Sequence, residues 1–334
     1  MMKENYPIDF VVTWLDGNDP EWQAECKKYY KEEKGIDMSI ARMRDWDNLQ
    51  YWFRSVEKYA TWVNKIHLVT WGHLPKWLNK DAKKLNIVKH TDFIPKEYLP
   101  TFSTFPNNLN THRIKGLSEH FVLFDDDMFL GKKVDRTRFF KNGKPVDIAQ
   151  LTPIPPVLPF GHYLLNSASL MHQRYRFNAA ILKNIFKWFN LIYGVSSNLK
   201  NLFLLPFANN VGLKNPHVAI PFLKSTYEKL WKEEFEVLDN TSKNRFRSNI
   251  DVMHWVLRYE QLLSGNFVPH TIKDTCTDLI TDQRAEEIAD YIAKQKYAIF
   301  CINDCNDIVD FEKTKNIINQ AFEKILPEKS SFEL

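Results

Sequence analysis

Three consecutive aspartates form the strongest candidate for chemistry in the chain. Asp125, Asp126 and Asp127 follow the apolar residues 121–124 in the segment VLFDDDMFLG. Adjacent carboxylates repel one another, so a cation or a row of backbone donors is needed to hold them together. Mg²⁺ prefers oxygen ligands and commonly takes one or two carboxylates with phosphate oxygens and water. A solvated acidic turn is the alternative, and the residues alone leave both interpretations open.

A second polar segment, DGNDP at residues 16–20, follows the apolar residues 8–14. Asp, Gly and Asn all form turns, so an ordinary turn is the simpler interpretation. In the functional interpretation, Gly17 lets the backbone approach a nucleotide closely. For both polar segments, the residues alone leave open whether the end of the strand binds a ligand.

Several cationic residues could offset phosphate charge, although a single arginine more often lies at the surface or in a salt bridge. His217, between Pro216 and Pro221, could move a proton. Together with the carboxylates, these residues supply the parts needed for phosphoryl transfer. The chain has neither a GxxxxGK[ST] loop nor a protein-kinase signature, which disfavours ATP-dependent kinases. The candidate cations are Arg42, Arg44, Arg54, His112, Arg113, Arg245 and Arg247.

The elements around these residues alternate between strands and helices. β-Branched and aromatic runs predict strands at 8–14, 66–70, 85–88, 121–124 and 298–302. Apolar spacing predicts helices at 48–59 and 311–325 and a helical pattern over 221–261. This order predicts an α/β fold with a Rossmann-like mixed or parallel sheet flanked by helices, and a mainly helical second half packed on it. Ligands gather at the carboxyl ends of such strands, where both polar segments lie.

Prolines at 153–156 suggest a boundary after the predicted sheet. We expect a nucleotide-sugar-binding α/β part at 1–150, an amphipathic helical insertion at 151–215, and a segment at 216–334 that completes the active site. All three belong to one catalytic domain in this interpretation.

Composition limits the partners and the location. The net charge of +4 is too weak and dispersed to indicate nucleic acid, but it suits an anionic substrate. No window reaches about 18 uninterrupted apolar residues, which predicts a cytoplasmic protein. Residues 177–207 combine aromatic and aliphatic residues with Lys183, Lys187 and Lys200. They fit peripheral contact with the inner face of the membrane, and packing on the sheet explains them equally well.

Four segments in order resemble the signature blocks of the Stealth family. This family comprises bacterial capsular polysaccharide phosphotransferases related to the catalytic subunit of animal N-acetylglucosamine-1-phosphotransferase. The first block resembles IDFVVTWLDGNDP, and the second runs from RMRDWDNLQYWFRSVEKYATWVNKIHLVTWGHLPKWLN through HRIKGLSEHF to DDDMFLG. The third includes EEFEVLDNTSKNRFRSNID, and the fourth resembles FCIND.

The resemblance implies transfer of a hexose 1-phosphate, such as N-acetylglucosamine 1-phosphate, from a UDP-sugar to a sugar hydroxyl of a growing surface polysaccharide. A phosphodiester forms and UMP leaves. The acidic motif of the family is commonly Asn-Asp-Asp, and its first position is Asp125 here. The resemblance therefore implies that Asp126 and Asp127, with Asp304 of the fourth block, are the ligands of Mg²⁺ or Mn²⁺.

Further roles carry over by position. The resemblance assigns His217, Arg247 and Asp251 to catalysis. Our own hypothesis adds Arg113 to the catalytic residues and assigns Trp14, Asp16, Gly17, Asp19 and Arg44 to the nucleotide. His217 is either the base for the acceptor hydroxyl or a covalent nucleophile. Two rival functions remain open: a metal-dependent glycosyltransferase that releases UDP, and a non-catalytic polysaccharide-binding protein.

Overall fold

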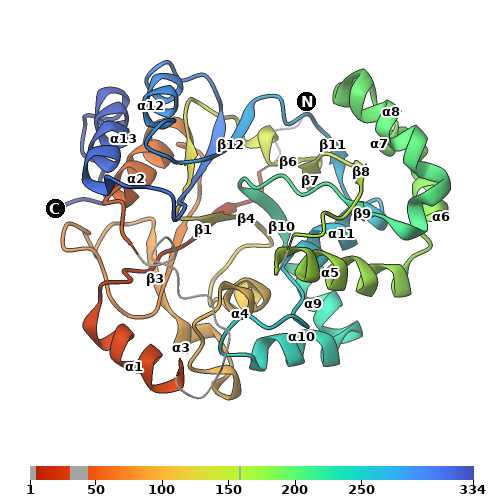
Figure 1. Ribbon diagram of the computed structural model, residues 1–334, viewed down its shortest axis with the longest axis horizontal. Coiled ribbons are helices and arrows are strands. Elements are labelled where there is room, and N and C mark those ends of the chain that lie inside the picture. Colours follow the sequence, from red (N-terminus) through yellow and green to blue (C-terminus); the bar gives the residue numbers. More distant parts are fainter. Residues whose placement is uncertain (1–4, 31–43, 158) are drawn as a thin grey trace.

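A five-stranded sheet runs through the middle of the molecule in the order β10-β4-β1-β2-β3 (Figure 1). The computed structural model describes residues 5–30, 44–157 and 159–334. β4, β1, β2 and β3 are parallel, and β10 pairs antiparallel with β4 at one edge. The strands are β1 (Ile8–Thr13), β2 (Ile66–Thr70), β3 (Leu85–Lys89), β4 (His120–Asp125) and β10 (Ile220–Leu223).

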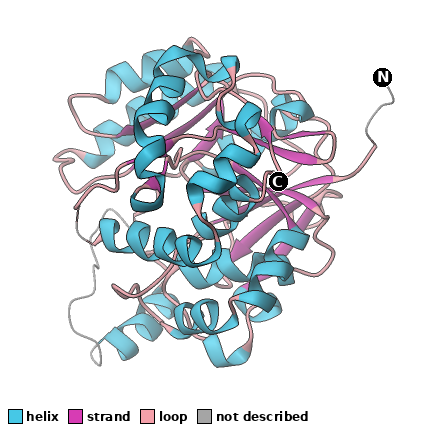
Figure 2. Ribbon diagram, turned by 90° about the vertical axis from the view of Figure 1, so that its right-hand side faces the viewer, coloured by secondary structure: helices cyan, strands magenta, loops and turns pink. Residues whose placement is uncertain are grey.

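β1 shows why this sheet is covered on both faces. Ile8, Phe10 and Val12 belong to one apolar cluster, whereas the intervening Val11 belongs to another. Side chains alternate between the two faces of a strand, so the buried apolar run at residues 10–12 needs a hydrophobic layer on each side. Helices supply both layers, as Figure 2 shows on the two sides of the strands. The predicted α/β fold with a mixed sheet flanked by helices is therefore confirmed.

Helices α2, α12 and α13 cover one face, and α4, α5, α9, α10 and α11 cover the other. The helices are α1 (Pro20–Tyr30), α2 (Leu49–Tyr59), α3 (His90–Phe93), α4 (Thr104–Asn110), α5 (Phe160–Arg174), α6 (Phe177–Lys183), α7 (Ile185–Trp188), α8 (Gly194–Leu204), α9 (Lys224–Glu233), α10 (Phe235–Lys243), α11 (Trp255–Leu263), α12 (Ala285–Ala293) and α13 (Phe311–Ile325); short 3₁₀ turns are η2 (Lys96–Tyr98), η3 (Thr111–Arg113), η4 (Arg136–Arg138), η5 (Leu191–Tyr193) and η6 (Leu205–Asn210).

The continuous helical pattern predicted over 221–261 is wrong at two places. Its first residues belong to β10, an edge strand that tolerates Pro221 because one side of its backbone needs no strand partner. Residues 244–254 form an irregular loop between α10 and α11. Both departures matter for function, because β10 and this loop carry candidate site residues.

A second sheet, β12-β13-β5, meets the first sheet at the three aspartates. β4 ends at Asp125, and β5 begins at Met128 and pairs antiparallel with β13. The backbone N–H of Ile302 on β13 donates to the carbonyl of Asp127 at 3.0 Å. The acidic segment is thus the junction between two sheets. The strands are β5 (Met128–Leu130), β12 (Thr275–Leu279) and β13 (Ile299–Asn303).

Small strand pairs complete the fold. β6 (Phe140–Lys141), β7 (Lys144–Asp147) and β11 (Val268–Pro269) form one sheet, and β8 (Leu151–Thr152) pairs antiparallel with β9 (Gly212–Leu213). The β8-β9 pair brings together the two ends of the segment that contains α5 to α8. No helix within the described ranges is long and apolar enough to cross a membrane.

Candidate active site

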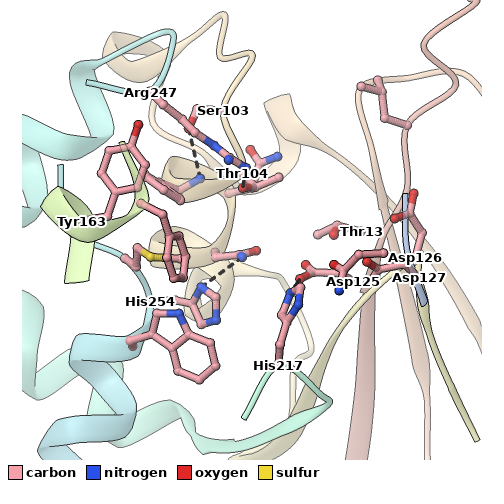
Figure 3. A pocket seen from close by; sticks show the side chains of 18 of the residues that line it. Thr13, Ser103, Thr104, Asp125, Asp126, Asp127, Tyr163, His217, Arg247 and His254 are labelled. Atoms are coloured by element: carbon pink, nitrogen blue, oxygen red, sulfur yellow. Dashed lines mark hydrogen bonds and ion pairs between the residues drawn. The ribbon is translucent and has the colours of Figure 1, made fainter. Parts of the chain in front are cut away.

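A pocket of about 1140 Å³ opens at the carboxyl ends of β1 and β4 (Figure 3). It lies where the topology predicts ligands on an open α/β sheet. The polar residues that line it come from distant parts of the chain and include Thr13, Arg44, Asp45, His90, Ser103, Thr104, Asn107, Asn108, Asp125, Asp126, Asp127, Tyr163, Lys214, Asn215, His217, Arg247, Asn249, His254, Asn303, Asp304 and Asn306.

The antiparallel edge strand places His217 beside the carboxylates. Ile220 of β10 pairs with Leu123 of β4 in an antiparallel register. Continuing this register by two residues towards the N-terminus reaches the position opposite Asp125, and His217 is the residue just before that position. Nε2 of His217 lies 3.7 Å from Oδ2 of Asp125, and Nδ1 lies 3.8 Å from the Sγ of Cys301. The carbonyl of His217 accepts a hydrogen bond from Thr277. The imidazole is therefore oriented from both sides.

Asp125 and His217 shift each other's proton affinity. Burial opposes the charged form of each, but the contact between them prevails. It holds the pKa of Asp125 below its usual value, with Arg247 among the smaller favourable charges. The pKa of His217 is raised, with Asp127 adding to the effect of Asp125. An imidazole stabilised in its protonated form by a carboxylate is suited to accepting a proton.

Asp126 and Asp127 are held in a setting that favours a cation. Burial, followed by the neighbouring carboxylates, raises the pKa of Asp126 well above its usual value. Burial raises the pKa of Asp127 to about 6, and Asp125 adds to the effect. Oδ1 of Asp127 is buried without a hydrogen-bond partner. A buried acceptor without a partner is costly, and a bound cation would remove that cost.

A complete protein-only metal site is absent from the described residues, in which no group of three His, Cys, Asp or Glu side chains converges on one point. Such a site is not required for Mg²⁺, which usually takes one or two carboxylates and completes its shell with water and substrate phosphates. Asp126 and Asp127 fit that requirement.

Arg247 lies on the wall that faces the carboxylates across the pocket (Figure 3). Its Nη2 donates to the Oγ1 of Thr104 at 3.1 Å, and its guanidinium lies 4.9 Å from the ring centroid of Phe105. Tyr163 of α5 and Ser103 stand on the same wall. This wall can offer positive charge and hydroxyl donors to an anionic substrate.

Asp251 does not line the pocket but organises the loop that carries Arg247. It is buried, and its carboxylate accepts hydrogen bonds from the side chain of Asn244 at 2.6 Å and the backbone N–H of Ser248 at 2.7 Å. Burial raises the pKa of Asp251 to about 6 despite these bonds. The catalytic role of Asp251 stays a prediction. Its hydrogen bonds indicate that it positions the loop that carries Arg247.

Replacing Asp251 with Asn separates these roles. We expect Asp251→Asn to keep activity within about tenfold, because an amide still accepts a hydrogen bond within the loop. The folded pKa lies above the usual 3.8, so wild-type stability falls as pH rises towards about 6. Relative to the Asn variant, wild type should lose about 3 kcal/mol across that window. Urea unfolding at several pH values measures this change, and a loss of turnover with normal folding would indicate catalysis instead.

Arg44 and Asp304 bind each other at the edge of the pocket. The Nε of Arg44 donates to Oδ2 of Asp304 at 2.6 Å, and Nη2 donates to Oδ1 at 2.5 Å. Trp46 donates its Nε1–H to the same carboxylate at 3.1 Å. The predicted nucleotide-binding and metal-binding residues thus form one ion pair that lines the pocket. Whether either contacts a substrate or a metal stays a prediction.

Polar groups of the 16–20 turn form hydrogen bonds with other residues of the protein. Asp19 accepts a hydrogen bond from the backbone of Trp22 in the first turn of α1, and Asp16 donates its backbone N–H to Nε2 of His73. The carbonyl of Gly17 accepts from Gln23. Of the predicted nucleotide-binding residues in this region, Trp14 lines the pocket.

Four candidate cations in the described part of the chain do not line the pocket: Arg54, His112, Arg113 and Arg245. Arg113 is exposed, donates to Asn110 and stacks on Trp231, away from the pocket lining. Arg42 lies outside the described residues.

His254 was missed by sequence reasoning. It lines the pocket just before the first residue of α11. Its Nδ1 lies 3.3 Å from Nδ2 of Asn108, and its ring stacks on Trp255. Burial lowers its pKa to about 4, so it is neutral near pH 7. No neighbouring motif marks this residue in the sequence, because the fold alone brings α4 and α11 together.

Family models and known proteins agree with the resemblance. Conserved region 1 of Stealth proteins matches residues 6–33, and conserved region 2 matches residues 42–147. A capsular polysaccharide phosphotransferase WcwK of Streptococcus pneumoniae is 42% identical and aligns over 98% of both chains. The receptor polysaccharide phosphotransferase WefC of Streptococcus oralis is 39% identical over 98% of this chain and 99% of its own.

The solved structures that align over most of this chain are more distant in sequence. The galactosyltransferase LgtC is 10% identical with a TM-score of 0.38, over 93% of this chain and 95% of its own. Mouse xyloside xylosyltransferase 1 is 12% identical with a TM-score of 0.36, over 91% of this chain and all of its own.

The match over nearly the whole chain places the protein in a class of bacterial polysaccharide-building transferases. It belongs to the Stealth family.

Proposed function

We propose that the protein transfers a hexose 1-phosphate from a UDP-sugar to a hydroxyl group of a growing capsular or surface polysaccharide. The product is a phosphodiester, and UMP is released. The observation that carries this proposal is the pairing of His217 with Asp125 at 3.7 Å, next to Asp126 and Asp127 and across the pocket from Arg247. The names of the relatives support a polysaccharide as the acceptor.

The reaction breaks the bond between the sugar-proximal phosphorus and the bridging oxygen of the diphosphate. The acceptor oxygen forms a new bond to that phosphorus, and its proton passes to His217. Asp125 stabilises the imidazolium that results, because its carboxylate lies beside the ring. Arg247 offsets charge on the transferred group. Asp126 and Asp127 would hold Mg²⁺ or Mn²⁺, which supplies positive charge to the diphosphate when bound.

A screen of nucleotide-sugars with a short acceptor oligosaccharide tests this proposal. Chromatography should detect UMP that appears only when donor, acceptor and enzyme are all present. N-Acetylglucosamine is the first sugar to try, since the resemblance points to it. Acceptor-dependent release of UDP would instead support a glycosyltransferase, and binding of sugars without nucleotide release would support a binding protein.

A further inference from the structure

The α6–η6 arm, residues 177–210, carries an unusual concentration of exposed apolar side chains. It forms an outer layer at the right-hand side of the molecule in Figure 1. Phe186 is 85% exposed, Leu191 96% and Phe203 72%. The other exposed members are Leu182, Ile185, Ile192, Val195, Leu199, Leu202 and Phe207. Monomeric proteins rarely leave such a contiguous set uncovered without a partner or a membrane.

Helix α8 shows that this exposure is built into the arm. Val195, Leu199, Leu202 and Phe203 recur at the spacing of one helical face, and this face is exposed. The inward position is polar: Asn201 is 1% exposed and accepts from the backbone of Leu151 at 2.8 Å. Its amide also donates to two backbone carbonyls. The helix is therefore anchored by a buried amide and presents its apolar face outwards.

The charged side chains of the arm itself are all cationic. Residues 148–227 contain no Asp or Glu, although the chain has 41 such residues among 334. Arg176, Lys183 and Lys200 are exposed on the arm and its entrance, and Lys273 lies beside Gly194 at the start of α8. Lys187 belongs to the fold instead, because its Nζ binds the carbonyl of Gly265. The arm thus combines exposed apolar residues with a net positive charge of its own.

We propose that the α6–η6 arm docks on an anionic lipid surface, with its exposed apolar side chains entering the interface and its cations facing lipid headgroups. Apolar residues flanked by Lys and Arg are the features of an interfacial membrane-binding segment. A second copy of the chain is a poorer occupant, because a two-fold interface would bring these like charges together. The proposal does not depend on the reaction assigned to the pocket.

The position of the arm has a consequence for the site. Helix α5 starts at Phe160 on the pocket wall and ends three residues before α6 begins. Its 15 residues span about 22 Å at 1.5 Å per residue. Docking of the arm therefore holds the pocket within a few tens of ångströms of the membrane, within reach of an acceptor saccharide carried there.

Co-sedimentation of the full chain with vesicles tests the proposal. Wild type should bind vesicles that contain phosphatidylglycerol and should bind phosphatidylcholine vesicles weakly. Binding should weaken as salt rises from about 0.1 M to about 1 M, because the headgroup attraction is screened. Phe186→Ser, Leu191→Ser and Phe203→Ser together should reduce binding by about tenfold or more, because less apolar area is buried. Lys183→Gln with Lys200→Gln should remove most of the preference for anionic lipid.

Matched controls keep the outcome clear. Val309→Ser with Leu334→Ser changes equally exposed apolar residues outside the arm, and Lys80→Gln with Lys83→Gln changes exposed lysines elsewhere. These controls should bind like wild type. The thermal unfolding midpoint should be unchanged in all variants, which excludes unfolding as the cause of weaker binding. Failure of wild type to bind at low salt, equal binding by the arm variants, or an arm-dependent oligomer without lipid would overturn the proposal.

Discussion

Replacing Asp126 or Asp127 with Asn should lower turnover by orders of magnitude and leave the fold intact. The substitution nearly preserves shape but removes the charge that attracts a divalent cation. Burial already opposes ionisation of both carboxylates, so loss of the charge should not destabilise the chain. Steady-state turnover measures the first effect, and thermal unfolding measures the second.

Asp290→Asn is a matched control, since Asp290 is exposed on α12 and pairs with Lys294. It should turn over like wild type. Excess EDTA should stop the wild-type reaction, and added Mg²⁺ or Mn²⁺ should restore it. Full turnover in EDTA, or normal rates in both site variants, would exclude a metal role for these carboxylates.

His217→Ala should reduce the rate by roughly 10²-fold or more, the usual contribution of a positioned proton-transfer group. The structure supports a large effect because Asp125 orients this imidazole and raises its pKa. His162→Ala on α5 is the control, since His162 lies outside the pocket lining. Rates near wild type in His217→Ala would remove this residue from the mechanism.

A trapping experiment with the wild-type enzyme separates two mechanisms for His217. A nucleophile would take the hexose 1-phosphate onto its ring nitrogen and release UMP when the enzyme meets the donor without an acceptor, and an acid-labile sugar phosphate would then be found on the protein. A general base forms no such adduct. We expect no adduct, because Asp125 and Cys301 hold both ring nitrogens within the site.

Local patterns predicted most of the elements that surround the site. The runs at 66–70 and 311–325 match β2 and α13 in full, because apolar spacing alone defines them. The three aspartates were recognisable because a strong buried strand stops where they begin. Their place at the carboxyl end of β4 followed from the parallel order of the sheet.

Other features depend on contacts that no local pattern records. Strand β10 is short and contains Pro221, so it resembled the start of the next helix, and its pairing with β4 is what brings His217 to Asp125. The Arg44–Asp304 pair joins residues 260 positions apart. These features arise from tertiary packing, which overrides local propensity.

The bond that breaks is the central claim, and phosphorus NMR of the purified oligosaccharide product tests it most directly. Attack of the acceptor oxygen on phosphorus leaves the sugar C1–O bond intact. We therefore predict one new phosphodiester resonance, coupled to the transferred sugar with the anomeric configuration of the donor retained. A product that carries the transferred sugar but contains no phosphorus would contradict the account.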